Sequence, residues 1–230
     1  MGIRRAVVLL SGGVDSATCL LIARAAGWEV FALSLDYGQW HALELDRART
    51  LATRYGAAEH RVLRVDWPTP AASALTDATR QVPKNRLGED PIPATYVPAR
   101  NTVFLALAIS YAESVGASDV FIGANALDYS GYPDCRPEFL EAFERVANLG
   151  TRAGALGESR YRIHAPLLQM TKGEIVAKAT ELGLDFSLTL SCYDPSHEGR
   201  PCGACDACLL RAKGFLEAGI TDKKQVIDPE

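Results

Sequence analysis

Short apolar runs and longer amphipathic stretches alternate along the first two thirds of the chain. The runs are too short for core helices and predict buried strands, at residues 6–10, 30–35, 61–65 and 119–122. Apolar residues recur at helical spacing over residues 14–26, 41–55 and 100–115. Gly27 and Gly56 follow two of these stretches in the position that ends a helix. This order predicts a Rossmann-like α/β fold, a parallel sheet with helices on both faces.

Residues 67–98 break the alternation, because they hold six of the twelve prolines and show little periodicity. They predict a long loop, and loops of that length are usually functional or mobile. Further helices are predicted at 137–149, 171–182 and 206–218, and a short strand at 161–165. Thr171 and Glu174 have the spacing of a capping box at the start of the second of these helices. We predict a nucleotide-binding domain over 1–188 and a small C-terminal segment over 189–230.

Composition narrows the class of protein. Hydrophobic residues make up 48% and charged residues 23%, which is typical of a folded globular chain. The formal net charge of −4 disfavours a nucleic-acid partner, since binding a polyanion usually needs a positive surplus. The first apolar run, residues 6–10, is too short for a signal peptide or a membrane span. We therefore expect a cytoplasmic protein with small-molecule ligands and no membrane partner.

A glycine-rich turn joins the first predicted strand to the first helix. Adjacent glycines and a helix N-terminus together present backbone N–H groups and a positive dipole end to an anion. The predicted nucleotide-binding residues are Leu10, Ser11, Gly12, Gly13, Val14, Asp15 and Ser16. Asp15 is expected to hold Mg²⁺ or to brace the loop. The turn is not a Walker A loop, because it lacks the lysine of that motif.

Four of the six cysteines crowd into residues 192–208: Cys192, Cys202, Cys205 and Cys208. Four thiolates with Cys-x2-Cys spacing form a closed structural zinc site, with no ligand position left for catalysis. Cys205 and Cys208 should flank the N-terminus of the last helix. An iron–sulfur cluster is the alternative. Cys19 is predicted to be helix core.

Several stretches together resemble a known family. Ser-Gly-Gly-Val-Asp-Ser at 11–16 resembles the signature of the N-type ATP pyrophosphatases, or PP-loop proteins. Four further stretches match the 7-cyano-7-deazaguanine synthase family: 36–39 with His41, 96–101, 128–135 and the cysteine tail. The resemblance covers about residues 5 to 220. This chain has Ala99 where the family usually has glycine, and Asn125-Ala126-Leu127 where the family is usually more polar.

The resemblance implies a reaction. ATP would be cleaved between its α and β phosphates, giving AMP and pyrophosphate. With Mg²⁺ and ammonia, 7-carboxy-7-deazaguanine would pass through an adenylate and an amide to the 7-cyano product. Sequence leaves open whether the reaction stops at the amide. The resemblance also implies a homodimer, and free ammonia is the simplest nitrogen source, since no glutaminase domain is present.

The resemblance also points to substrate-binding residues in 128–135: Asp128, Ser130, Gly131, Tyr132 and Asp134. A carboxylate is the natural acceptor for the ring N1–H and exocyclic amine, and Tyr132 is suited to stack on the ring. Which aspartate faces the ring is left open. The alternative is a solvated loop.

Three further residues are candidates for the site. Arg100 is suited to bidentate contact with a carboxylate or phosphate, the alternative being a solvent-exposed side chain. Lys172 lies in the first turn of a helix, where the dipole opposes a cation, and an anionic ligand would explain it. Asp36 ends the second strand, where Rossmann-like folds contact ribose or base. Arg100, Lys172 and Asp15 form the predicted catalytic set.

Two competing functions share parts of this pattern. A PP-loop sulfur transferase acting on tRNA would use the same adenylation, but it needs an RNA-binding surface and reactive cysteines. A zinc-knuckle nucleic-acid-binding protein with a vestigial nucleotide fold would bind RNA without consuming ATP. The acidic charge balance counts against the sulfur transferase.

Overall fold

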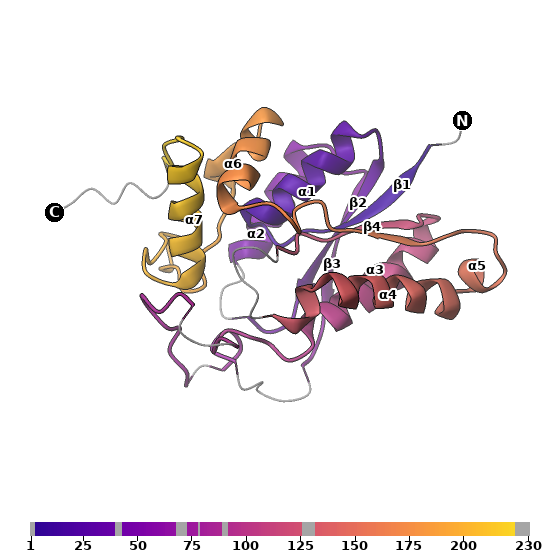
Figure 1. Cartoon of the computed structure of the whole chain (residues 1–230), viewed down its shortest axis with the longest axis horizontal. Helices are drawn as coiled ribbons and strands as arrows, with labels where there is room; N and C mark the ends of the chain where they lie inside the picture. Colours follow the sequence, from indigo (N-terminus) through magenta and orange to yellow (C-terminus); the bar gives the residue numbers. More distant parts are fainter. Residues whose placement is uncertain are drawn as a thin grey trace.

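A five-stranded parallel sheet forms the centre of the molecule (Figure 1). The computed structural model describes residues 3–39, 43–67, 73–77, 79–88, 92–125 and 132–223. The strands lie in the order β3-β2-β1-β4-β5. Their bounds are Arg5–Leu9 for β1, Glu29–Asp36 for β2, Glu59–Arg64 for β3, Asp119–Phe121 for β4 and Arg162–His164 for β5. The order changes direction at β1, which places the phosphate-loop candidate at the switch point of the sheet.

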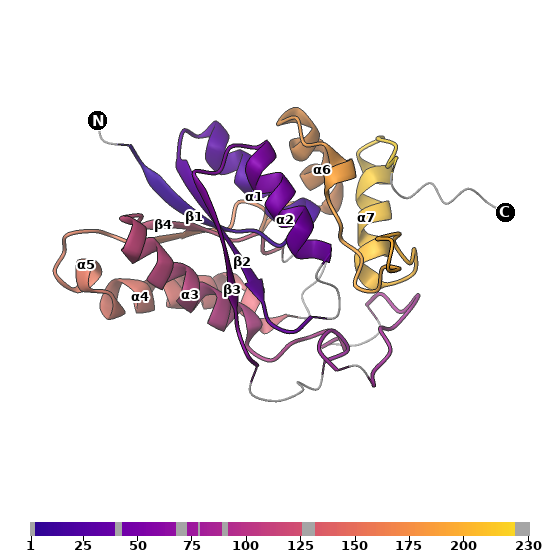
Figure 2. The ribbon, with the colours of Figure 1, turned by 180° about the vertical axis from the view of Figure 1, so that it is seen from behind.

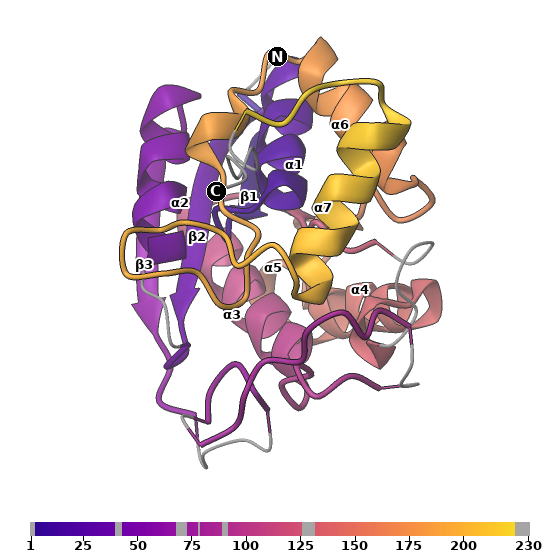
Figure 3. The ribbon, with the colours of Figure 1, turned by 90° about the vertical axis from the view of Figure 1, so that its left-hand side faces the viewer.

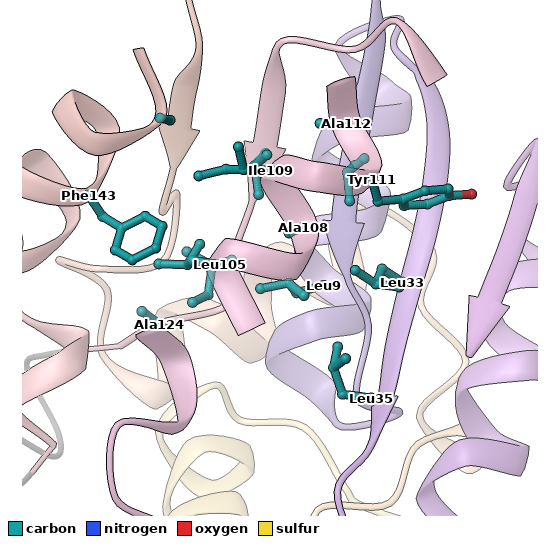
Figure 4. Close-up of a cluster of buried hydrophobic side chains, with 14 of the residues drawn as sticks. Leu9, Leu33, Leu35, Leu105, Ala108, Ile109, Tyr111, Ala112, Ala124 and Phe143 are labelled. Atoms are coloured by element: carbon teal, nitrogen blue, oxygen red, sulfur yellow. The ribbon is translucent and has the colours of Figure 1, made fainter. Parts of the chain in front are cut away.

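Helices cover both faces of the sheet, because successive strand residues point to opposite sides. Leu9, Leu33 and Leu35 face α3 (Arg100–Val115) and α4 (Pro137–Gly150), as Figure 4 shows for α3 and Phe143 of α4. The residues that alternate with them along the same strands point to the other face, where α1 (Val14–Ala25), α2 (Leu43–Arg54) and α6 (Lys172–Glu181) lie. Figures 1 and 2 show these two groups of helices on opposite sides. The predicted α/β architecture is confirmed.

The predicted elements recur with shifts of one or two residues at their ends. The capping box at Thr171 and Glu174 is present, and Gly27 and Gly56 have φ of 83° and 68° after α1 and α2. The start predicted for the second helix, at His41, lies outside the described residues. The described part of 67–98 holds no helix or strand. No helix among the described residues is long and apolar enough to cross a membrane.

The sequence pattern missed three short elements. They are α5 (Arg152–Ala155) and two 3₁₀ turns, η1 (Pro133–Cys135) and η2 (Phe186–Leu188). Elements of three or four residues hold about one period of the helical pattern, too few to show a repeat, so periodicity does not reveal them.

The last helix, α7 (Asp206–Glu217), packs against α6 through two glycines (Figure 3). A Cβ at Gly214 would lie 2.8 Å from the Lys172 carbonyl oxygen, and one at Gly173 would lie 2.6 Å from Glu217 Cβ. Gly173 also donates its N–H to Glu217 Oε2 at 3.0 Å. This close approach fixes the first turn of α6, which carries Lys172.

Candidate active site

A cavity of about 330 Å³ opens at the carboxyl edge of the sheet, where ligands bind in open α/β folds. Its walls come from segments that are far apart in the sequence. They are the phosphate loop, the end of β2 with the start of α2, the start of α3, the end of β4, the first turn of α6, residues 190–193 and α7. The cavity is the meeting point of most of the predicted site residues.

The glycine-rich loop has the conformation of an anion cradle. Gly12 has φ of 87°, and a Cβ there would lie 2.4 Å from the Glu44 carbonyl oxygen, so the position requires glycine. Ser16 Oγ donates to the Gly13 carbonyl at 3.1 Å and accepts from the Ser11 N–H at 3.1 Å. These bonds hold the loop closed around the N-terminus of α1. The predicted loop residues that line the cavity are Leu10, Ser11, Gly13, Val14, Asp15 and Ser16.

Lys172 and Asp15 meet beside the loop. The Lys172 ammonium contacts Asp15 Oδ2 at 2.6 Å, and only 14% of the lysine side chain is exposed. The pair spans 157 positions of sequence and joins α6 to α1. A cation and a carboxylate at the edge of an anion cradle provide one group for phosphate oxygens and one for a metal ion.

Arg100 is half-buried and lines the cavity from the start of α3. Its guanidinium lies 5.9 Å from the ring centroids of Tyr37, Phe104 and Tyr132. It donates to Tyr37 Oη at 3.4 Å. Burial raises the pKa of Tyr37 to about 12, so that hydroxyl is neutral at physiological pH and does not neutralise the arginine charge. The structure thus places Arg100 inside the cavity rather than in solvent.

Tyr132 extends this aromatic wall. Its hydroxyl is hydrogen-bonded to Thr95 Oγ1 at 2.9 Å, and its ring lies 5.9 Å from that of Tyr96. Tyr193 also lines the cavity, from the segment that follows Cys192. Neutral tyrosine rings around one guanidinium suit a flat, anionic heterocycle.

Asp134, two residues after Tyr132, is buried but does not line the cavity. Its Oδ2 accepts the backbone N–H of Asn101 at 2.8 Å and caps the N-terminus of α3. Ala99, the N-cap residue, offers no side-chain cap and adopts φ 52° and ψ 28°, in the left-handed region. The alanine found in place of the family's glycine therefore occupies a position that favours glycine.

Two other predicted groups do not reach the cavity in the described structure. Asp36 ends β2, but its Oδ1 accepts the N–H of Gly38 at 3.3 Å, and the residue does not line the cavity. Gly12 faces α2 instead. Asp128, Ser130 and Gly131 lie outside the described residues.

Sequence reasoning missed Glu44, a lining residue in the first turn of α2. Its Oε1 accepts from Gln39 Nε2 at 2.9 Å. Burial raises the pKa of Glu44 to about 7, and the nearby Arg100 and the bond from Gln39 act in the opposite direction. A signal was available, because Gln39 belongs to the quoted Asp-Tyr-Gly-Gln stretch and Glu44 follows it at a helix start.

The four clustered cysteines are close enough together to hold one metal ion. Their sulfur atoms all lie within 4.8 Å of one another, and those of Cys192 and Cys205 are 4.0 Å apart. Tetrahedral zinc with bonds of about 2.3 Å places sulfurs roughly 3.8 Å apart, so the residues fit. Cys205 is the N-cap of α7, as predicted.

The cysteine cluster also anchors part of the long loop. Lys84 Nζ donates to Asp194 Oδ2 at 2.7 Å and is hydrogen-bonded to Cys202. The Asn85 N–H donates to the Ala204 carbonyl at 2.8 Å. Cys192 itself lines the cavity together with Tyr193. The cluster therefore connects the long loop, α7 and one wall of the cavity.

Comparison with known proteins agrees with this geometry. Residues 5–219 match the family model described as "Queuosine biosynthesis protein QueC". The chain belongs to the QueC family. QueC relatives named 7-cyano-7-deazaguanine synthase include one from Syntrophotalea carbinolica, 58% identical over 95% of both chains. Another, from an Anaeromyxobacter species, is 60% identical over 95% of this chain and 94% of the relative.

Solved structures share the fold of this QueC family member at low sequence identity. A predicted tRNA methyltransferase subunit from Methanocaldococcus jannaschii has a TM-score of 0.50 and 20% identity, covering 77% of this chain and 76% of that one. NMN synthetase from Francisella tularensis has a TM-score of 0.50 and 17% identity, covering 96% of this chain and 79% of that one. These similarities bear on the fold alone.

Proposed function

We propose that this protein is an ATP-dependent carbon–nitrogen ligase that converts 7-carboxy-7-deazaguanine and ammonia into 7-cyano-7-deazaguanine. Relatives of 54–60% identity over nearly the whole chain carry the name of that synthase. The observation that carries the proposal is the cavity itself, which has an anion cradle with Lys172 at one side and Arg100 among aromatic rings at the other.

The cradle is the site for ATP in this proposal. Backbone N–H groups of residues 12–16 and the Lys172 ammonium would bind phosphate oxygens and stabilise charge as the α phosphate is attacked. Asp15 would hold Mg²⁺, which supplies charge neutralisation on the phosphates when bound. A carboxylate is a poor electrophile, and transfer of AMP to its oxygen creates a leaving group. Ammonia then gives the amide, and a second activation allows the nitrile to form.

The substrate acid is assigned to the aromatic side of the cavity. Arg100 would bind its carboxylate and Tyr132 would stack on the ring. Asp128, Ser130 and Gly131 remain proposed substrate contacts from the predicted loop, and Asp36 a proposed ribose contact. Asp134 accepts the backbone N–H of Asn101 and so would hold the first turn of α3, which carries Arg100.

The remaining proposals concern the assembly. Cys192, Cys202, Cys205 and Cys208 would hold one structural zinc per chain. We also propose a homodimer in the cytoplasm, acting on small molecules without a nucleic-acid or membrane partner.

The test is a product assay. Purified protein is incubated with 7-carboxy-7-deazaguanine, ammonium, Mg²⁺ and ATP, and bases and nucleotides are resolved by mass spectrometry. A 7-cyano product that requires both ATP and ammonium, accompanied by AMP, is the expected result. ADP in place of AMP would overturn the assignment of the loop. An amide without nitrile would restrict the reaction to its first half, and thiolation of tRNA would favour the sulfur-transfer alternative.

A further inference from the structure

The proposed reaction must remove protons from nitrogen. When ammonia adds to the acyl adenylate, a C–N bond forms, the bond to AMP breaks, and one N–H proton must leave to give the neutral amide. When the activated amide becomes a nitrile, the C–O bond to the second AMP breaks and the nitrogen loses its two remaining protons. A base placed at the reacting carbon would serve these steps, so the inference below rests on the proposed function.

Glu44 has the geometry of such a base. Gln39 fixes one of its oxygens, and Gln39 itself is held by two further bonds, from the Tyr37 N–H at 2.8 Å and to the Leu35 carbonyl at 3.2 Å. Over the described ranges of the chain, the second carboxylate oxygen has no hydrogen-bond partner. The residue lines the cavity between the phosphate loop, which its backbone touches, and Arg100. A fixed carboxylate with one uncommitted oxygen is therefore available to a ligand.

The other ionisable groups of the cavity are less suited to accept a proton. Among the described lining residues the carboxylates are Asp15 and Glu44, and Asp15 is engaged by Lys172 at 2.6 Å. Burial raises the pKa of Cys135 to about 11 and that of Tyr37 to about 12, so both are protonated at neutral pH. Arg100 is a cation. Glu44 remains as the acceptor.

The proton affinity of Glu44 agrees with this role. Burial raises its pKa to about 7, against the opposing effects of Arg100 and Gln39. A general base is most effective when its pKa lies near the working pH, because it is then both deprotonated and basic. The charged and titratable groups that act on it are Arg100 from α3 and Tyr37 from the end of β2.

We propose that Glu44 is the general base of the nitrogen-transfer steps, accepting protons from ammonia and then from the amide nitrogen. Each proton passes to solvent before the next is taken. The adenylation step, in which oxygen attacks phosphorus, does not use this carboxylate.

The test separates the two half-reactions. Glu44→Gln keeps an oxygen that can accept from Gln39 but cannot take a proton. We expect adenylate formation from ATP and the acid, measured without ammonia as pyrophosphate release, to be unchanged in this variant. Conversion of the adenylate to amide in a single turnover should fall by about 100-fold or more. Asp46→Asn, which removes a charge from the exposed side of the same helical turn, is the matched control and should leave both steps unchanged.

A pH profile gives a second readout. With O-methylhydroxylamine as nucleophile, a weak base that stays uncharged throughout the range around pH 7, the transfer rate of the unmodified protein should rise with pH up to about 7 and then level off. The Glu44→Gln profile should be flat. Stability should change in the opposite direction. The folded state holds the Glu44 proton more tightly than the unfolded chain, so the unmodified protein should lose stability relative to the variant as pH rises towards 7.

Three outcomes would overturn the assignment. A higher KM for the acid with an unchanged transfer rate would make Glu44 a recognition residue. An equal loss in pyrophosphate release without ammonia and in nitrogen transfer would give it a role in binding ATP. A Glu44→Gln profile that keeps the break near pH 7 would assign the base to another group. If the unmodified protein makes AMP but no carbon–nitrogen bond, the proposed function itself fails, whatever the variant does.

Discussion

Lys172 occupies a costly position, since a cation in the first turn of a helix opposes the helix dipole. Asp15 offsets this cost in the described structure, at 2.6 Å, and phosphate oxygens would do so when ATP is bound. We expect Lys172→Met to lower the rate of AMP formation by about 100- to 1,000-fold, the cost of losing a transition-state charge contact. The measurement is pyrophosphate release with saturating acid and ATP.

Lys178→Met is the control for this change. Lys178 lies in the same helix and pairs with Glu181 near the surface at 3.0 Å, away from the cavity. Its replacement should leave AMP formation unchanged, since pairs of this kind contribute little. Equal losses in the two variants would show that Lys172 supports α6 rather than the reaction.

Ala99 carries backbone strain, because its φ of 52° is one that glycine adopts without a Cβ clash. We expect Ala99→Gly to stabilise the fold by about 0.5 to 1 kcal/mol, after the extra freedom of glycine in the unfolded chain is subtracted. Ala177→Gly, in the exposed part of α6, should instead destabilise by about 1 kcal/mol. Chemical denaturation compares the two, and a loss of stability in both would contradict the strain.

For single residues, the sequence pointed to the phosphate loop and to Arg100, Tyr132 and Lys172, which line the same cavity, but it missed Glu44 and Tyr193. The phosphate loop was recognisable because its residues are neighbours in sequence. Glu44 and Tyr193 could not be placed, because their role depends on which side of a cavity each segment faces. Asp134 was expected near the ring, but it caps α3, a contact set by a turn that periodicity does not show.

Helices α6 and α7 pack against each other closely, with glycine at both points of contact. A Cβ at Gly214 would meet the carbonyl oxygen, Cβ and carbonyl carbon of Lys172 at 2.8, 2.9 and 3.0 Å. We expect Gly214→Ala to push the helices apart and to destabilise by about 1 to 3 kcal/mol. AMP formation should also slow, since Lys172 moves with the first turn of α6. Thermal unfolding and the pyrophosphate assay measure the two effects.

Gly150→Ala is the matched control for this overpacking. Gly150 ends α4, and a Cβ there would meet no atom within 4 Å. The melting temperature should therefore stay the same or rise slightly. A melting temperature of Gly214→Ala that equals that of Gly150→Ala would mean that α7 adjusts freely.

Most elements could be predicted because each carries a local signal. Glycines mark the ends of α1 and α2, and the capping box marks the start of α6. The proposed boundary between residues 188 and 189 stays a prediction. Leu190 donates its N–H to the Gly12 carbonyl at 2.9 Å, so the C-terminal segment is bonded directly to the phosphate loop. Composition and spacing give no sign of such a long-range bond.

For the whole molecule, the cysteine cluster joins parts that sequence leaves separate. We expect one zinc per chain in the purified protein, measured by mass spectrometry of metals, and none after Cys205→Ser. Loss of the metal should lower the melting temperature and weaken binding of the acid, because Cys192 and Tyr193 form one wall of the cavity.

Cys19→Ala is the control for the metal analysis. Cys19 is fully buried in α1, away from the cluster, so its replacement costs packing but should keep the metal. Iron in place of zinc in the purified protein would indicate an iron–sulfur cluster at the four cysteines. Full metal content in Cys205→Ser would contradict the four-thiolate site.

The packing of α7 on α6 has a consequence for synthesis of the chain. Lys172 belongs to α6, but the contacts that fix its turn come from residues 214 and 217. A nascent chain that has left the ribosome only as far as α6 contains the whole sheet and the phosphate loop, yet it lacks the α7 contacts to the turn that carries Lys172. If Lys172 binds phosphate as proposed, nucleotide should stabilise the chain fully only once α7 has emerged and docked.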